Sequence, residues 1–273
     1  MPELPEAETV RRALDEALRG RSITGVEVFT PSMRTPLTPL LSAELPGKSF
    51  TGVRRRGRYL LADLSDGRVL LMHFGMSGAV RVEDASVPRR KHEHVFLRLS
   101  DGKIFRFACT RRFSLLEVHD AGPDGIPAAL EKLGMEPLSG DFTGEAFFSA
   151  CRGRNGAVKN LLMDNAVVTG IGNIYASETL FAAGVDPRRP GASLSPDECS
   201  RIVAEAKKIL RKSIECGGTT VADFRRVDGS PGDFSRHLRV YGRAGEACPR
   251  CGAPVSRVRL GGRSSFFCMR CQK

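Results

Sequence analysis

The spacing of apolar residues changes twice along the 273-residue chain. Between residues 5 and 19, apolar side chains recur at helical spacing, and Gly20 follows as a stop signal. From about residue 22 to 119, short β-rich runs replace this pattern, and after about residue 130 helical patterns return. The pattern therefore predicts one helix, then a sheet-forming region, then a helical region.

The central region predicts seven or eight short strands. Two of their joints are near-copies, "LSDGRV" at 64–69 and "LSDGKI" at 99–104. Asp-Gly between two apolar runs is a strong hairpin signal, because this pair tolerates the backbone angles of tight turns. An antiparallel sandwich or barrel is the expected architecture. The runs are "SITGVEVF", "SFTGVRRRGRYLLADL", "RVLLMHF", "AVRVE", "HVFLRL", "KIFRFAC" and "FSLLEV".

The second half predicts helices and a loop. The longest helical pattern, 195–216, begins with a capping box from Ser195 to Glu198 and ends at Gly217. Residues 217–235 are rich in Gly, Thr and Asp and predict a mobile loop. The other helical segments are "TGEAFFSACRG", "AVKNLLMDN" and "GNIYASETLFAAG".

Four of the eight cysteines form a metal-site pattern. "CPRC" and "CMRC" give the spacing C-x2-C-x16-C-x2-C, which is typical of one structural zinc ion held by four thiolates. A disulfide pair or a redox motif is the alternative. Two β runs around Gly261-Gly262 make the module a zinc ribbon, with Arg263 at its tip. The expected ligands are Cys248, Cys251, Cys268 and Cys271. These features predict three regions: a β-sandwich with its helix (1–130), a helical region (131–235) and the ribbon (236–273).

The charge distribution points to a polyanionic partner. Subtracting 31 acidic from 42 basic residues gives +11, and residues 235–273 hold nine Arg or Lys against Glu246 alone. Nucleic acid is the first candidate, and a merely basic protein is the alternative. No apolar run is long enough to span a membrane and no export signal is visible, so a soluble, unexported protein is expected.

Three further motifs suit contacts with DNA. The turn "GIGNIYASE" opens a helix and exposes backbone N–H groups beside Asn173, although helix-opening glycines are common. Met76 in "HFGMSG" and Phe113 in "TRRFS" suit side chains that wedge between bases, with Arg111 beside them. A buried methionine that only fills a gap is the alternative for Met76.

Taken together and in this order, the motifs resemble one family, the bacterial formamidopyrimidine-DNA glycosylases with their endonuclease VIII-like relatives. The resemblance covers nearly the whole chain, and the start "ELPE" favours the formamidopyrimidine branch over the "EGPE" typical of the other. It implies an α+β fold of two domains: an N-terminal antiparallel β-sandwich with an N-terminal helix, and a helix-two-turn-helix domain with a zinc ribbon. The motifs that carry it are "MPELPEAET", "HFGMSG", "KHEHV", "RRF", "LMDN", "GIGNIYASE", "SIECGGTT", "VYGR" and "CxxC…CxxCQK".

The resemblance implies a bifunctional DNA glycosylase and abasic-site lyase that flips out and excises oxidised purines, namely 8-oxoguanine and formamidopyrimidines. Removal of Met1 exposes the secondary amine of Pro2, whose pKa near ~8 lies far below the ~10.4 of lysine. In the family this amine attacks the sugar C1′, and β,δ-elimination follows. Glu3 is the implied general acid and base.

The implied DNA contacts are carried over position by position. Arg263 grips phosphate and assists δ-elimination, while Asn173 and Lys159 clamp the phosphates that flank the flipped nucleotide. Further DNA contacts are assigned to His92, Arg111 and Arg154, and the gap left by the extruded base to Met76, Arg111 and Phe113. The implied partner is double-stranded DNA with a damaged base or abasic site, bound by a monomer in the bacterial cytoplasm.

Two departures from the family pattern affect the expected chemistry. Arg58 in "RRRGRYLL" replaces the family lysine of "RR-x-K-Y-L", and arginine does not give up a proton near neutral pH. Retained binding and abasic-site cleavage with altered 8-oxoguanine excision are therefore expected. "CTRRFS" replaces "DPRRFG" and affects the pose of Arg111 and Phe113. The alternatives are an endonuclease VIII-like enzyme for oxidised pyrimidines and a catalytically weakened damaged-DNA-binding paralogue.

Overall fold

The computed structural model describes residues 2–37, 39–220, 227 and 229–273, so the central part of the predicted loop 217–235 lies outside the described residues. The chain forms two compact units. Unit 1 comprises Met1–Glu131 and Gly217–Asp233, and unit 2 comprises Lys132–Cys216 and Phe234–Lys273. The domains 1–130, 131–235 and 236–273 stay a prediction, since compactness groups the ribbon with the helices and residues 217–233 with the first unit.

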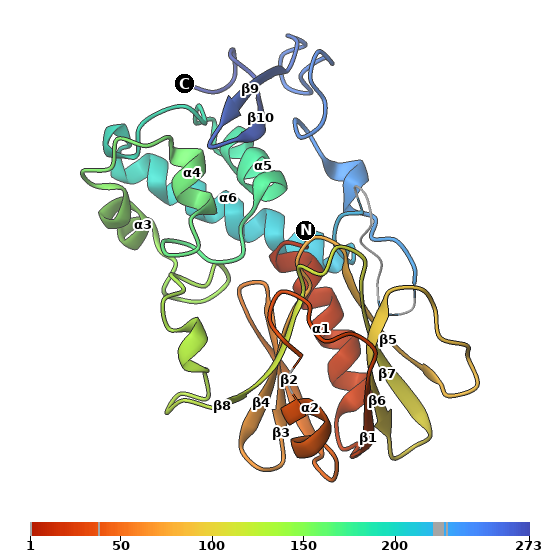
Figure 1. Ribbon diagram of the computed structural model, residues 1–273. Coiled ribbons are helices and arrows are strands. Elements are labelled where there is room, and N and C mark those ends of the chain that lie inside the picture. Colours follow the sequence, from red (N-terminus) through yellow and green to blue (C-terminus); the bar gives the residue numbers. More distant parts are fainter. Residues whose placement is uncertain (1, 38, 221–226, 228) are drawn as a thin grey trace. The chain divides into compact units, whose positions relative to one another are not determined.

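Unit 1 is an antiparallel sandwich of two four-stranded sheets, as the strand pattern predicted (Figure 1). Both Asp-Gly joints are hairpins, with Gly67 and Gly102 each at φ +84°. The first sheet has the order β1 (Ile23–Val28), β6 (Glu93–Leu99), β7 (Lys103–Cys109), β5 (Gly78–Asp84). The second has the order β2 (Phe50–Arg56), β3 (Tyr59–Leu64), β4 (Arg68–His73), β8 (Leu115–Asp120).

Helix α1 (Leu4–Leu18) packs on β2 and β3, and its apolar stripe enters the sandwich core. The short helix α2 (Pro39–Glu44) lies between β1 and β2 and has no counterpart among the predicted elements, because six residues are too few for a helical period to stand out. Burial does not alternate strictly along the strands: β3 and β7 each contain runs of consecutive buried residues, so side chains on both faces of these strands are covered in the middle of the sheets.

Two loops of unit 1 pass from one sheet to the other. The β4–β5 loop leaves at His73 and arrives at Gly78, and the β7–β8 loop leaves at Cys109 and arrives at Leu115. His73 is paired with Leu115 and Gly78 with Cys109. The two loops therefore start and end on paired residues, which holds them side by side. They carry Met76 and the segment 111–113.

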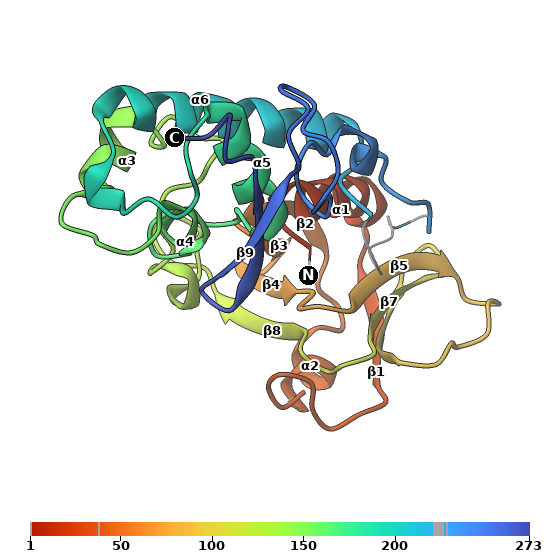
Figure 2. The same cartoon turned by 90° about the horizontal axis from the view of Figure 1, so that it is seen from above.

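Unit 2 packs helices around a second core and carries a β-hairpin (Figures 1 and 2). Figure 2 shows the hairpin of β9 (Ser256–Leu260) and β10 (Arg263–Phe267) beside α5, and β10 packs on that helix. The helices are α3 (Gly144–Cys151), α4 (Val158–Met163), α5 (Asn173–Ala183) and α6 (Pro196–Glu215). Short 3-10 turns lie at Ala128–Leu130 in unit 1 and at Gly191–Ser193 and Phe234–His237 in unit 2.

The capping box of α6 is present as predicted: Ser195 accepts from the Glu198 N–H, and the Glu198 carboxylate accepts from the Ser195 N–H. Within the described residues, none of the helices has the length and apolar character needed to cross a membrane.

Candidate functional site

The first turn of α1 is built around two carboxylates. Glu3 is the N-cap, and its side chain accepts from the Glu6 N–H, while Glu6 Oε2 accepts from the Glu3 N–H at 2.8 Å. Both are almost fully buried. Glu6 Oε1 also accepts from the Thr219 N–H at 2.7 Å. One carboxylate thus holds Pro2 and Glu3 against the helix start and fixes the beginning of the 217–233 segment.

Arg58 lies buried next to a histidine that the sequence interpretation did not single out. Burial, followed by the positive charges of Arg58 and Arg34, lowers the pKa of His73 to about 4. The Tyr59 ring lies 4.7 Å from the His73 ring, and the Gly75 N–H donates to His73 Nδ1 at 3.2 Å. His73 is therefore neutral at physiological pH, and its Nδ1 accepts the hydrogen bond that holds the beginning of the β4–β5 loop.

The three predicted gap-filling side chains lie on the two sheet-to-sheet loops. Met76 is 46% exposed and Phe113 is 52% exposed, which places them among the few large apolar side chains of the described chain that face solvent. The Arg111 guanidinium lies 5.4 Å from the centroid of the Phe113 ring. The structure therefore brings Met76, Arg111 and Phe113 together, and it does not favour the alternative of a buried, gap-filling methionine.

His92 sits at the end of the β5–β6 loop with φ +68°, a backbone region that non-glycine residues rarely occupy. The loop before it is held from inside: Arg106, 1% exposed, donates to the carbonyls of Val87 at 2.5 Å and Pro88 at 3.2 Å and contacts the Glu93 carboxylate at 3.3 Å. A buried ion pair therefore positions the loop that presents His92.

In unit 2, Lys159 supports Asn173 from behind. Its Nζ lies 2.5 Å from Asn173 Oδ1 and 2.6 Å from Ser265 Oγ, and it also donates to the Ser264 carbonyl at 3.3 Å. Asn173 Nδ2 donates to the same carbonyl at 3.0 Å. Lys159 is only 1% exposed, so in this conformation its ammonium group does not reach an external phosphate.

Arg263 is exposed and begins β10 directly after the Gly261-Gly262 turn, as predicted. Because Ser264 and Ser265 follow it, the contacts of Lys159 and Asn173 fix the strand that presents its guanidinium. Arg154 is also exposed, and its guanidinium lies 3.7 Å from the Asp164 carboxylate. Lys159 and Asn173 are therefore linked to the strand that Arg263 begins, whereas the contact of Arg154 is with Asp164.

A buried glutamate that the sequence interpretation missed ties the ribbon to the helices. Glu178 of α5 is 4% exposed, and its carboxylate accepts from the N–H groups of Arg239, Val240 and Tyr241 at 2.8–3.0 Å. Burial raises the pKa of Glu178, and the three backbone donors oppose that effect. These three hydrogen bonds hold the segment of chain that leads into the zinc ribbon.

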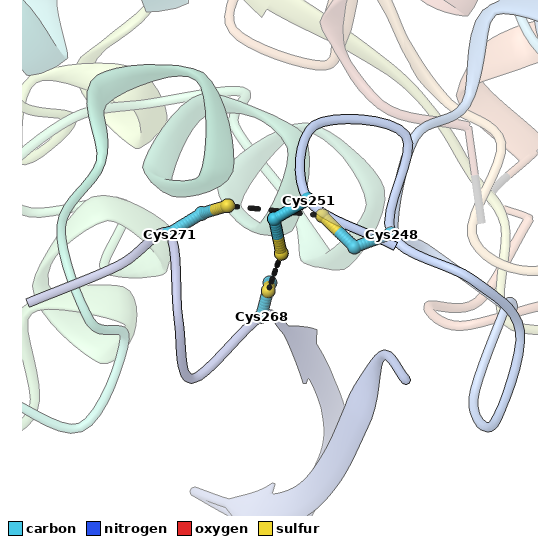
Figure 3. A group of neighbouring side chains, drawn as sticks. All are labelled: Cys248, Cys251, Cys268 and Cys271. Carbon is cyan, nitrogen blue, oxygen red and sulfur yellow. Dashed lines mark hydrogen bonds between the residues drawn. The ribbon is translucent and has the colours of Figure 1, made fainter. Parts of the chain in front are cut away.

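The four expected zinc ligands converge (Figure 3). Their Sγ atoms all lie within 4.8 Å of one another, with Cys248 to Cys271 at 3.9 Å and Cys251 to Cys268 at 3.5 Å. Tetrahedral Zn–S bonds of ~2.3 Å require S···S separations of about 3.8 Å, so the group fits zinc. Burial and the three neighbouring thiols raise the pKa of Cys271 to about 12, and a divalent cation offsets that by favouring thiolates. The cluster therefore supplies one structural zinc site.

The predicted site residues divide between the two units. Unit 1 carries Pro2, Glu3, Arg58, Met76, His92, Arg111 and Phe113, and unit 2 carries Arg154, Lys159, Asn173, Arg263 and the four cysteines. The sequence interpretation did not single out Glu6 as a bridge, nor His73, Arg106 or Glu178. Two of these residues have a signal in the sequence, because a charged or titratable side chain stands inside an apolar strand run: His73 in "RVLLMHF" and Arg106 in "KIFRFAC".

Known families match the chain in three consecutive parts. Residues 1–116 match the formamidopyrimidine-DNA glycosylase N-terminal domain, residues 133–225 the formamidopyrimidine-DNA glycosylase H2TH domain, and residues 245–273 a zinc finger found in FPG and IleRS. Fold, zinc site and matched models thus define the class of zinc-finger DNA glycosylases.

Full-length relatives give the same result. The chain is 48% identical to the formamidopyrimidine-DNA glycosylase of Laribacter hongkongensis and 47% identical to that of Alteromonas mediterranea, each over 100% of both chains. Lactococcus lactis FPG in complex with Fapy-dG-containing DNA is similar in structure, with a TM-score of 0.88 and 32% identity over 99% of this chain and 100% of that one. A second L. lactis complex, with abasic-site DNA, has a TM-score of 0.89 at 32% identity, over 99% of each chain. The chain belongs to the formamidopyrimidine-DNA glycosylase family.

Proposed function

We propose that this protein excises oxidised purines from double-stranded DNA and then cuts the strand at the resulting abasic site. The observation that carries the proposal is the arrangement at the start of α1, where Glu6 and Glu3 hold the segment that contains Pro2. A nucleophile needs a fixed position relative to its proton donor, and the capping box provides it at a chain end that otherwise frays. The L. lactis complexes with Fapy-dG and abasic-site DNA support this substrate class.

In the proposed reaction, removal of Met1 exposes the Pro2 amine. The amine nitrogen bonds to C1′ as the base leaves with its electron pair, and Glu3 transfers protons to open the sugar ring. Loss of the ring oxygen from C1′ gives an iminium, which acidifies the neighbouring C2′ protons and permits β-elimination and then δ-elimination. Hydrolysis of the iminium returns the free amine.

We assign phosphate contacts to Asn173 and Arg263, further DNA contacts to His92, Arg111 and Arg154, and gap filling to Met76, Arg111 and Phe113. Lys159 differs from its sequence-based role: because it is buried against Asn173 and Ser265, we propose that it positions Asn173 rather than binding phosphate itself. The zinc ion, held by its four cysteines, stabilises the ribbon and takes no part in the reaction, since four thiolates leave no open position for substrate.

We propose that Arg58 supplies a fixed positive charge at this place and exchanges no protons. Its burial beside neutral His73 favours a fixed charge at this place over a proton carrier. This supports the expectation that 8-oxoguanine excision is altered while abasic-site cleavage is retained.

Borohydride trapping tests the proposal. A duplex with one abasic site is incubated with the protein and sodium borohydride, which reduces an iminium to a stable amine. A covalent adduct at the mass of protein plus DNA, with the DNA attached to Pro2 in peptide mass spectra, is expected. Pro2→Gly, which replaces the secondary amine by a primary amine at the same position, is the control for adduct position, because its adduct should map to Gly at residue 2. Binding without any adduct from the natural sequence would identify a damaged-DNA-binding paralogue.

Oxidised pyrimidines are a second candidate substrate class. L. lactis FPG has also been solved in complex with DNA that contains an oxidized pyrimidine. A duplex panel with 8-oxoguanine, Fapy-dG and an oxidised pyrimidine, compared by kcat/KM, separates the two classes. We also propose that the protein acts as a monomer in the cytoplasm, where bacterial DNA lies, and the bacterial sources of its relatives support this location.

A further inference from the structure

The two sheet-to-sheet loops of unit 1 are joined to each other by a reciprocal pair of serines. Ser77, on the β4–β5 loop, accepts from the Arg111 N–H of the β7–β8 loop at 3.0 Å. Ser114, at the end of the β7–β8 loop, donates from Oγ to the Phe74 carbonyl of the β4–β5 loop at 2.8 Å. Each loop therefore supplies one hydroxyl to the backbone of the other.

The fit between these loops leaves no space for adjustment. A Cβ added at Gly75 would lie 2.5 Å from the Phe113 carbonyl oxygen, and one added at Gly78 would overlap the Phe74 carbonyl oxygen and the Ser114 hydroxyl. Gly75 also has φ +56°, which only glycine adopts without strain. The backbones are thus in direct contact, and the hydroxyl of Ser114 is fully buried between them.

Further contacts fix the second loop. The Arg34 N–H donates to the Ser114 carbonyl at 3.1 Å, which ties a third segment to the same place. Arg112 has φ +54°, and a non-glycine residue in that region persists only when its surroundings hold it there. Arg112 lies between Arg111 and Phe113, so this held turn directs the two neighbouring side chains.

We propose that Ser77 and Ser114 are positioning residues that join the two loops into one preformed wedge carrying Met76, Arg111 and Phe113. The proposal rests on the proposed function, in which these three side chains occupy the gap left by the extruded base. A wedge already ordered in the free protein spends less binding free energy on ordering itself when it enters DNA. The serines therefore assist base extrusion and not the covalent steps at Pro2.

This division of roles gives a specific test. Ser77→Ala and Ser114→Ala are expected to lower kcat/KM for excision of a paired oxidised purine about fivefold each, the size of one lost hydrogen bond. Cleavage of a duplex with a preformed abasic site is expected to stay within twofold of wild type, because no base has to be extruded there. Ser22→Ala is the matched control: its hydroxyl bonds Ser49 Oγ at 2.7 Å in the same unit, beside the start of β1, and both activities should be unchanged.

A second comparison separates positioning from loss of stability. In a Met76→Ala/Arg111→Ala/Phe113→Ala background, which lacks all three wedge side chains, each serine substitution is expected to have no further effect on excision. Equal excision by wild type and both serine variants, equal losses on the lesion and on the abasic site, or full additivity in that background would overturn the proposal. Failure of the proposed function is distinct, because wild type itself would then form no borohydride adduct.

Discussion

Replacement of Lys159 by methionine tests whether this residue touches DNA phosphate or supports Asn173. Methionine is an unbranched side chain one heavy atom shorter than lysine, and it removes the charge and the donors. The ammonium group makes two short hydrogen bonds, 2.5 Å to Asn173 Oδ1 and 2.6 Å to Ser265 Oγ. Hydrogen bonds to a charged group contribute about 1.5–3 kcal/mol each, partly offset because a buried charge is removed, so we expect the free energy of unfolding of unit 2 to fall by about 2–3 kcal/mol.

The salt dependence of DNA binding separates the two roles. The slope of log affinity against log salt concentration is negative, and each phosphate neutralised by a lysine or arginine adds about 0.9 to its magnitude. One such contact changes affinity about 3.5-fold between 50 and 200 mM salt. Because Lys159 is buried, we expect Lys159→Met to weaken binding by the same factor at every salt concentration, with an unchanged slope.

The assay is fluorescence anisotropy with an abasic-site analogue duplex over this salt range, combined with urea denaturation. Arg154→Met is the matched control, since the Arg154 side chain is 47% exposed and its removal should reduce the magnitude of the slope by about 0.9. If the magnitude of the slope falls by about 0.9 in Lys159→Met while the free energy of unfolding is unchanged, the positioning role is refuted and direct phosphate contact is supported.

Three further outcomes follow from other residues. Arg58→Lys should raise the single-turnover rate of 8-oxoguanine excision and leave abasic-site cleavage unchanged; equal excision rates contradict the reasoning. His73 has a folded-state pKa of about 4, below its unfolded value of ~6.5, so its stabilising contribution is complete above pH 6.5 and is lost as pH falls toward 4, by up to about 3 kcal/mol. Urea denaturation between pH 7 and 4.5 should show that the free energy of unfolding falls less steeply with pH in His73→Gln than in wild type. Parallel pH dependences of the two proteins would exclude His73 as the source of this loss. Cys251→Ser should reduce bound zinc, measured by atomic absorption, from one ion per chain and increase proteolysis within 245–273; a full zinc content contradicts a four-thiolate site.

Local signals in the sequence predicted the elements of both units well. The two Asp-Gly joints and the Ser195–Glu198 box depend only on residues close in sequence, so their physics is visible without the fold. The zinc ligands were predictable for the same reason, because each C-x2-C pair is a local unit. Helix α2 was missed because a single short turn of helix has no period to detect.

The residues that support the site could not be predicted from local pattern. Arg106, Glu178 and Lys159 read as ordinary charges in strands and helices, and their roles arise from partners brought close by tertiary structure. The pKa of His73 likewise depends on burial and on Arg58, which is 15 positions away in sequence but adjacent in space. Sequence pattern thus located candidate site residues, whereas the fold determined which of them are exposed and which are buried against other residues.

The two contacts of the Glu6 carboxylate have a consequence for biosynthesis. Its bond to the Glu3 N–H can form as soon as the first helix does, but its bond to the Thr219 N–H joins residues 213 positions apart. The chain passes from unit 1 to unit 2, back to unit 1 and again to unit 2, so Gly217–Asp233 reaches the sandwich only after most of the polypeptide has been translated. A nascent chain can therefore bury the sandwich core on the ribosome while the surroundings of its N-terminus are still incomplete. The closure of this long loop sets the moment at which the support of Pro2, the proposed nucleophile, is finished.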